Sequence, residues 1–150
     1  LGPILKFNED KMWLEIFNKK TINDTLLFRE AKIDIYNKKW GKEYKSKNKK
    51  AKKLLLEYQN QKLPADSIFD LNLWAKYIAI GKTLGSAHHL RWHNLRFYYN
   101  PKTTKIEPVG FDMSSWFNVN HWPYEGSFEP FYDFFYRNKK YKEKNRKFLK

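Results

Sequence analysis

Two strand-like runs separated by a short polar turn constrain the fold of this chain more than any other feature. Residues 95–100 read LRFYYN, residues 105–112 read KIEPVGFD, and the four residues between them are PKTT. Aromatic and β-branched runs that flank such a turn predict an antiparallel β-hairpin. If the turn is centred on residues 101–104, facing residues have numbers that sum to about 205, since the turn fixes the register.

This register brings two polar side chains toward each other at the open end of the hairpin. Asn94, just before the first strand, is expected opposite Phe111 or Asp112, just after the second. Facing residues of an antiparallel ladder lie roughly 5 Å apart. A carboxamide and a carboxylate together, with room for water and phosphate, suit Mg²⁺. The pattern therefore predicts Asn94 and Asp112 as ligands of one hard cation.

A helix with well-marked ends precedes the hairpin. Asp70 is a good N-cap for LNLWAKYIAIGKTLG, and Gly85 suits the left-handed residue that ends a helix. One face is predicted to be buried, because the apolar residues recur at helical spacing: Leu73, Trp74, Tyr77, Ile78 and Ile80. The following SAHHLRWHN is expected to be a loop or an irregular turn.

The other segments complete an α+β pattern without internal repeats. Strands are predicted in GPILKFNED and AKIDIYNK, and helices from Asp10 and over about residues 42–61. LPADSIFD is interpreted as a linker. Beyond the hairpin, MSSWFNVNHWPYEGS is expected to be irregular, and FEPFYDFFYRN and KYKEKNRKFLK are expected to be helices.

The composition suits one packed domain. Of the 150 residues 41% are hydrophobic and 19% aromatic, which excludes wholesale disorder. Without cysteine, disulfides and thiolate chemistry are excluded, and no apolar run approaches the ~20 residues that cross a bilayer. Because the chain starts at Leu1 and stops at Lys150 in a helix-like run, residues 1–150 are expected to be a partial domain cut at both ends.

The formal charge of +14 raises acidic partners as a possibility. The basic residues concentrate in the lysine run at residues 38–53, which is either a solvated face or a patch for an anionic partner. A nucleic-acid-binding domain is therefore one alternative. It is disfavoured because the run contains no arginine and lies apart from the histidine–asparagine loop.

The polar loop at residues 88–94 allows several interpretations. His89 and His93 stand four residues apart and could bind zinc with Asp112 or His121 as a third ligand, but the glutamate of HExxH is missing. The histidines could equally be packed or bonded within the loop. Arg91 and Arg96 could meet phosphate or pair with Asp70 or Glu107. Four aromatic residues are expected in the core: Trp92, Phe97, Tyr99 and Trp116.

Over most of its length the chain resembles the spore-coat CotH kinase-like family. The likeness is sharpest in HHLRWHNLRFYYNPKTTKIEPVGFD, after a helix that ends in LG. The resemblance implies the C-terminal lobe of a divergent protein kinase-like fold, mostly helical, with a β-hairpin that carries the metal-site residues. It also implies binding of ATP and Mg²⁺ or Mn²⁺ and phosphorylation of protein substrates.

By position, the resemblance makes Asp112 the metal-binding aspartate, Asn94 the asparagine before the aromatic strand, and His93 the histidine beside it. Two departures stand out. The loop after the helix reads GSAHH where family members carry a catalytic aspartate, and Ser114 stands where they have a second acidic residue. His88 or His89 is therefore the expected base, since a neutral imidazole accepts a proton near pH 7. Arg91 is a further candidate.

The family's lysine-bearing lobe that holds ATP would precede Leu1, and no glycine-rich phosphate loop occurs here. The chain is thus expected to be inactive alone. The other alternative is a catalytically dead surface or coat-assembly module of the same fold. The resemblance suggests the spore coat, the cell surface or secretion, while the residues themselves indicate no compartment.

Overall fold

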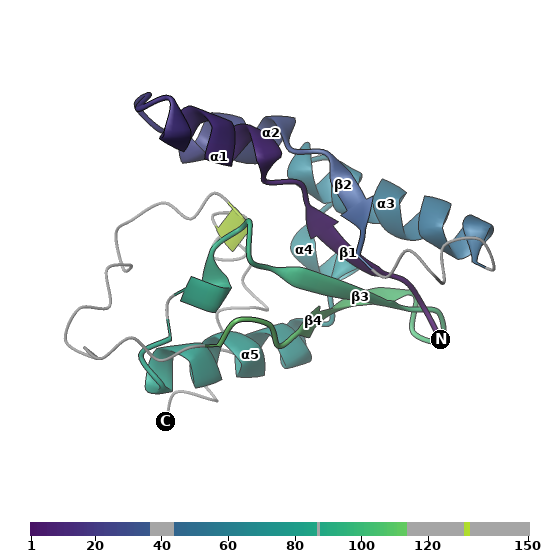
Figure 1. Ribbon diagram of the computed structural model, residues 1–150. Helices are drawn as coiled ribbons and strands as arrows, with labels where there is room; N and C mark the ends of the chain where they lie inside the picture. The colour runs from purple at the N-terminus through teal and green to yellow at the C-terminus, as the bar shows by residue number, and fades with distance from the viewer. Residues whose placement is uncertain (37–43, 87, 114–130, 133–150) are drawn as a thin grey trace.

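The computed structural model describes residues 1–36, 44–86, 88–113 and 131–132 (Figure 1). Its sheet has four antiparallel strands in the order β2-β1-β3-β4. The strands are β1 (Ile4–Phe7), β2 (Ile33–Ile35), β3 (Arg96–Asn100) and β4 (Lys105–Val109). The α+β class predicted from the sequence is confirmed, and all four predicted strands are present.

Five α-helices and one 3₁₀ helix accompany the sheet in the described ranges. They are α1 (Asp10–Phe17), α2 (Asp24–Glu30), α3 (Lys45–Gln59), α4 (Ala65–Ile68), α5 (Leu71–Thr83) and the 3₁₀ helix η2 (His88–Leu90). In Figure 1, α5 runs beside β4 and α3 lies beside β2, so that helices flank both edges of the sheet. Helices α1 and α2 lie beyond the end of β1.

The predicted hairpin register is confirmed. The pairs run from Arg96 opposite Val109 to Asn100 opposite Lys105, and the two numbers of each pair sum to 205. Residues 101–104 form the turn, and Thr104 at its end has a φ of 56°. A single short turn therefore fixes which residues leave the hairpin at the same end.

The predicted ends of α5 are also confirmed. Asp70 Oδ1 accepts hydrogen bonds from the backbone N–H of Asn72 (3.0 Å) and Leu73 (3.1 Å), which satisfies two donors that a helix leaves unpaired. Gly85 has a φ of 62°, in the left-handed region that glycine enters without a steric cost. The chain leaves α5 there and turns into the candidate site.

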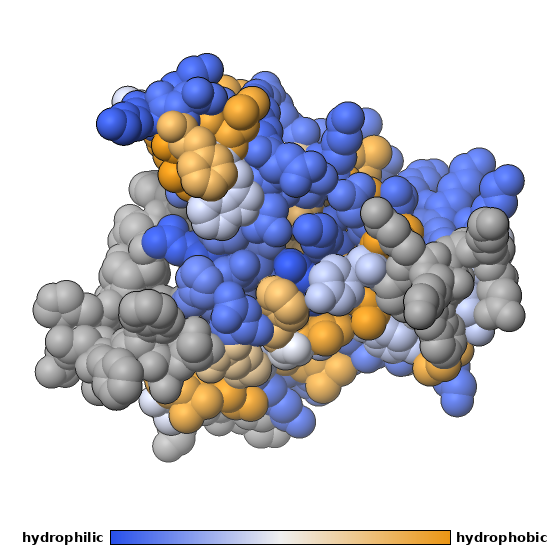
Figure 2. Space-filling view, viewed as in Figure 1, coloured by the Kyte–Doolittle hydropathy of each residue, from blue (hydrophilic) through white to orange (hydrophobic). Residues whose placement is uncertain are grey.

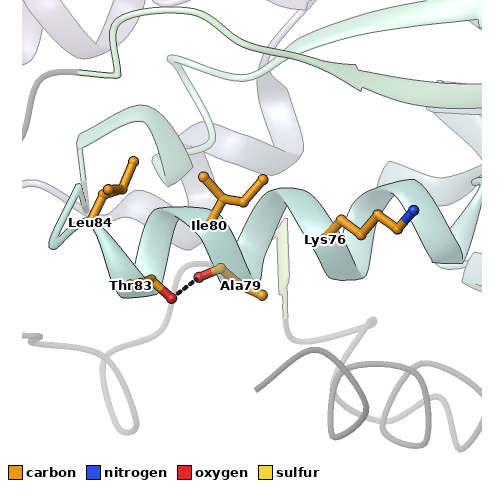
Figure 3. Close-up of a pocket in the computed structure, with 5 residues that line it drawn as sticks. All are labelled: Lys76, Ala79, Ile80, Thr83 and Leu84. Atoms are coloured by element: carbon orange, nitrogen blue, oxygen red, sulfur yellow. Dashed lines mark hydrogen bonds between the residues drawn. The ribbon is translucent and has the colours of Figure 1, made fainter. Parts of the chain in front are cut away.

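The predicted buried face of α5 is wrong in part. Trp74, Tyr77 and Ile78 are buried, whereas Leu73 is 38% exposed and Ile80 is 50% exposed. Ile80 lines a shallow groove of about 380 Å³ together with Lys76, Ala79, Thr83 and Leu84 (Figure 3). Within it, the Thr83 hydroxyl donates to the Ala79 carbonyl (3.0 Å), as the dashed line shows.

The segment interpreted as a linker contains the buried helix α4, so that interpretation is wrong. Ala65 and Ile68 are almost fully buried. Backbone contacts tie the next residues to β4: Phe69 forms a parallel bridge with Ile106, and the Asp70 N–H donates to the Ile106 carbonyl (3.1 Å). The indole of Trp74 donates to the same carbonyl (3.1 Å). These bonds fix α5 against the hairpin.

Aromatic rings fill the space between the sheet and the helices. Phe131 is fully buried, and its ring centroid lies 5.1 Å from that of Tyr58 and 5.3 Å from that of Trp74. The expected core residues Trp92, Phe97 and Tyr99 are buried, whereas Trp116 lies outside the described residues. Apart from Phe131 and Tyr132, which are helical, the predictions for residues 114–150 also fall outside them.

The surface carries apolar residues at one extremity. Trp13, Leu14 and Phe17 of α1 are 44%, 62% and 77% exposed, and Figure 2 shows apolar side chains gathered at this end of the molecule. None of the helices in the described ranges has the length and apolar character needed to cross a membrane.

Candidate functional site

The loop after α5 places the histidines beside the hairpin exit. Past the left-handed Gly85, the Ser86 N–H donates to the Gly81 carbonyl (2.9 Å), which holds the loop to the end of α5. Residues His88–Leu90 then form η2, and the Asn94 N–H donates to the Arg91 carbonyl (2.9 Å) to close the next turn. The loop is therefore folded tightly by its own backbone before β3 begins.

His88 and Asp112 meet directly. His88 Nε2 lies 3.0 Å from Asp112 Oδ2, and the two side chains are 49% and 41% exposed. One comes from the loop after α5 and the other from the chain just beyond β4. A carboxylate oxygen that faces Nε2 favours the tautomer with its proton on that nitrogen, which leaves Nδ1 as the proton acceptor.

Asn94 contacts the same histidine from the other side of the loop. Its Nδ2 donates to the His88 carbonyl (3.1 Å), and the residue is 7% exposed. The ladder ends at the pair Arg96–Val109, so Asn94 is not backbone-paired with Phe111 or Asp112 as an extended ladder would have it. Both residues contact His88 at different groups: Asn94 bonds to its backbone carbonyl and Asp112 to its ring. A direct approach of Asn94 to Asp112 stays a prediction.

The chain holds Asp112 in an unusual backbone conformation. Its φ of 50° lies in the left-handed region, which aspartate enters more readily than most residues. The preceding Phe111 ring lies under the Arg96 guanidinium, with 4.1 Å between Arg96 Cζ and the ring centroid. Tyr36 contacts the same ring at a centroid distance of 6.0 Å. Phe111 thereby anchors the carboxylate that follows it.

His89 occupies a different environment from His88. It is fully buried, with Nδ1 2.8 Å from Ser86 Oγ and the ring packed edge-on against Tyr77. Burial lowers the pKa of His89 to about 4, so it is neutral near pH 7. Nε2 faces Gly81 and has no hydrogen-bond partner in the described structure. Of the two predicted bases, only His88 is open to solvent.

His93 and Arg91 lie at the edge of this cluster. The His93 ring centroid is 6.4 Å from that of His88, and burial lowers the pKa of His93, with Glu9 opposing the shift. The carbonyl of His93 accepts a hydrogen bond from Arg96 Nη1 (3.0 Å). The Arg91 carbonyl accepts from Asn94 and Leu95, and its side chain is half-buried. Both residues therefore shape the turn that presents Asn94.

The donor set at this place fits Mg²⁺ or Mn²⁺ in its chemistry. Asp112 is exposed, and its Oδ1 is not used by His88; Asn94, a buried residue of the His88 loop, carries a carboxamide oxygen. One or two protein oxygens completed by water and phosphate oxygens are the usual environment of Mg²⁺. A histidine in contact with the carboxylate would compete with a cation at Oδ2, which leaves Oδ1 as the available oxygen.

A zinc site has less support. Within residues 1–36, 44–86, 88–113 and 131–132, no three histidine, cysteine or acidic side chains are grouped as ligands of one metal ion. His89 points into the core, and His121 lies outside the described ranges. The described part of the chain therefore offers the Asp112 carboxylate and the Asn94 carboxamide, and no cluster of nitrogen ligands.

The described part of the lysine run lies away from this loop, in the helix beside β2 (Figure 1). Its residues 45–53 belong to α3, on which Lys45, Lys49 and Lys53 are exposed. The helix has no acidic residue in its first turn. This face of α3 is therefore positively charged. Like charges four residues apart destabilise a helix by roughly 0.2–0.5 kcal/mol per pair, so the lysines slightly destabilise the helix that carries them.

The environment of Arg96 was not foreseen from the sequence. Arg96 is 4% exposed and pairs with neither Asp70, which caps α5, nor Glu107, which accepts from Asn100 (2.7 Å). Ser86 and Gly81 were also missed as the supports of His89. The alternation of side chains along β3 could have predicted part of this environment, because Arg96 stands two residues before Tyr98 and therefore lies on the same face of the strand.

No protein-family model, curated protein or solved structure was found to match this chain. The CotH kinase-like resemblance therefore stays a prediction, carried by the residues of the loop and hairpin.

Proposed function

We propose that this chain forms the metal-binding part of an ATP- and Mg²⁺-dependent protein phosphotransferase, in a divergent kinase-like C-terminal lobe. The observation that carries the proposal is the contact of His88 with Asp112 at 3.0 Å, with Asn94 bonded to the His88 carbonyl. Three residues predicted to take part in phosphoryl transfer, from the two segments that flank the hairpin, are thus linked by contacts, with His88 and Asp112 exposed and Asn94 buried.

Each of the three residues has a distinct role in this proposal. Asp112 Oδ1 and the Asn94 carboxamide oxygen would hold the cation, which would supply charge neutralisation for the phosphate oxygens. His88 Nδ1 takes the proton of the attacking hydroxyl, while Asp112 Oδ2 stabilises the imidazolium that forms. The hydroxyl oxygen bonds to the γ-phosphorus of ATP as the bond to ADP breaks.

The exposure of the histidines supports this assignment of roles. A base must reach the hydroxyl of a protein substrate, and the His88 side chain is 49% exposed whereas His89 is fully buried. A strong base is not essential, because phosphoryl transfer depends mainly on positioning and charge neutralisation. Asp112 is thus expected to matter more than His88.

The test is Asp112→Asn in the protein made from its complete gene. Asparagine preserves the shape and removes the charge, so Mg²⁺-dependent ATP turnover should be lost and Mn²⁺ binding, measured by electron paramagnetic resonance, should weaken. Asp10→Asn is the matched control, because Asp10 is an exposed residue of α1. Turnover and Mn²⁺ binding that survive in Asp112→Asn would reject the metal site.

A thermal-shift titration separates the enzyme from a catalytically dead binding module. A ligand at 100 times its dissociation constant stabilises the folded state by about 2.7 kcal/mol. ATP with Mg²⁺ should therefore raise the melting temperature of the wild-type protein more than that of Asp112→Asn. An unchanged melting temperature in the wild type would favour the binding module.

A further inference from the structure

Arg96 carries a buried positive charge that no carboxylate balances within the described ranges. The residue is 4% exposed, and it forms no ion pair with the acidic side chains in that part of the chain. Charged groups that leave water are costly unless they are paired and hydrogen-bonded. A buried arginine without an anion therefore requires an explanation.

The hydrogen bonds of Arg96 use only one corner of its guanidinium. Nη1 donates to the carbonyls of His93 (3.0 Å) and Leu95 (3.0 Å). Nε is enclosed and has no acceptor, and no acceptor contacts Nη2 among the residues that the structure describes. The N–H groups of Nε and Nη2 therefore lack acceptors within the described ranges, and a ligand reaches the enclosed Nε only when a covering side chain moves. Two parallel N–H groups on one edge are the arrangement that binds an oxyanion through two oxygens.

Aromatic rings shape the surroundings of this edge. The guanidinium carbon lies 4.1 Å from the centroid of Phe111 and 5.0 Å from that of Tyr36. Rings on a guanidinium fix its plane and stabilise the cation without taking up its N–H groups. Tyr36 is 47% exposed, so its ring lies between the guanidinium and solvent.

We propose that the Nε–Nη2 edge of Arg96 binds a phosphate group. Two phosphate oxygens match the two parallel N–H groups of an arginine, and the negative charge of phosphate would balance this buried cation. Arg96 lies next to the candidate site, because it bonds to the His93 carbonyl and packs on Phe111, the residue before Asp112. The phosphate comes either from a nucleotide or from free inorganic phosphate. The site does not require a metal at Asp112.

The experiment measures binding of inorganic phosphate and of ATP, both without metal, by isothermal titration calorimetry at constant ionic strength set with chloride. Constant ionic strength removes the diffuse attraction of the many lysines from the comparison. Arg96→Lys keeps the charge but loses the fork, so phosphate affinity should fall roughly tenfold or more. Arg29→Met, at an exposed arginine of α2, should bind as the wild type does.

Several results would overturn the proposal. It fails if wild type does not bind phosphate, if Arg96→Lys binds it as tightly as wild type, or if acetate binds equally well. Tighter binding of ATP than of inorganic phosphate, lost in Arg96→Lys, would identify a nucleotide as the source. The kinase proposal fails on a different readout, the metal-dependent turnover of Asp112→Asn, so the two failures are distinguishable.

Discussion

Replacement of Gly81 by alanine should destabilise this protein, although alanine normally stabilises a helix. A Cβ atom at Gly81 would lie 2.5 Å from His89 Cε1, 2.6 Å from His89 Nε2 and 3.2 Å from a methyl carbon of Leu90. The His89 ring cannot easily withdraw, because the residue is fully buried and bonded to Ser86. Overpacking of a buried site costs roughly 1–3 kcal/mol, and contacts this short belong at the upper end.

The helix propensity of alanine offsets part of this cost. Alanine is favoured over glycine in a helix interior by roughly 1 kcal/mol, so the net loss in the free energy of unfolding should be about 2 kcal/mol. Urea denaturation at pH 7.5 measures it directly. Gly81→Ala should instead stabilise the variant His89→Ala, in which the obstructing ring is absent. The two substitutions are then coupled by about 3 kcal/mol. A Gly81→Ala protein as stable as the wild type would refute the packing described for His89.

Two further changes test the same region. His89 has an ordinary pKa of 6.5 when unfolded and about 4 when folded, so the unfolded state binds more protons between these values and stability falls as the pH drops from 6.5 to 4. At about 1.4 kcal/mol per tenfold change in proton affinity, roughly 3 kcal/mol should be lost. Glutamine has no ionisable group, so for His89→Gln the free energy of unfolding, measured by urea denaturation, should fall between pH 6.5 and 4 by that much less than for the wild type. The same pH dependence in both proteins would contradict the prediction. Asp70→Ala removes the cap of α5 and should lower the melting temperature by an amount equivalent to about 1 kcal/mol. Asp70→Asn keeps the acceptor and should stay close to wild type, and equal losses in both would argue against the cap.

The parts of the fold that the sequence predicts well are those set by neighbouring residues. The hairpin register follows from its turn, and the ends of α5 follow from Asp70 and Gly85, so both could be derived without knowledge of the rest of the molecule. Helix α4 was missed for the opposite reason. A helix of four residues is too short to show a helical period, and its burial depends on β4.

The error on α5 has a geometric cause. At about 100° per residue, Leu73 and Ile80 lie within about 20° of each other around the helix axis, but about 100–160° from the Trp74–Ile78 side. The spacing of the apolar residues places all five on a broad arc of the helix surface. It does not indicate which part of that arc packs against the core. The contact with Ile106 fixes Trp74 inward, so Leu73 and Ile80 remain outside.

The orientation of the two histidines could not be predicted from the sequence for a similar reason. The geometry of their loop also links the stability of the fold to the candidate site. In a 3₁₀ helix, with three residues per turn, successive side chains point about 120° apart. The ring of His89 is buried against Gly81 and Tyr77, so the side chain of His88 points away from the core. It points toward the exit of the hairpin, where its Nε2 lies 3.0 Å from Asp112 Oδ2. The sequence HH cannot reveal which of the two histidines turns inward. In this structure the ring of His89 fills the space that a Cβ at Gly81, eight residues earlier, would need. The glycine that gives His89 its space therefore also orients His88, and displacement of the first ring should disturb the second.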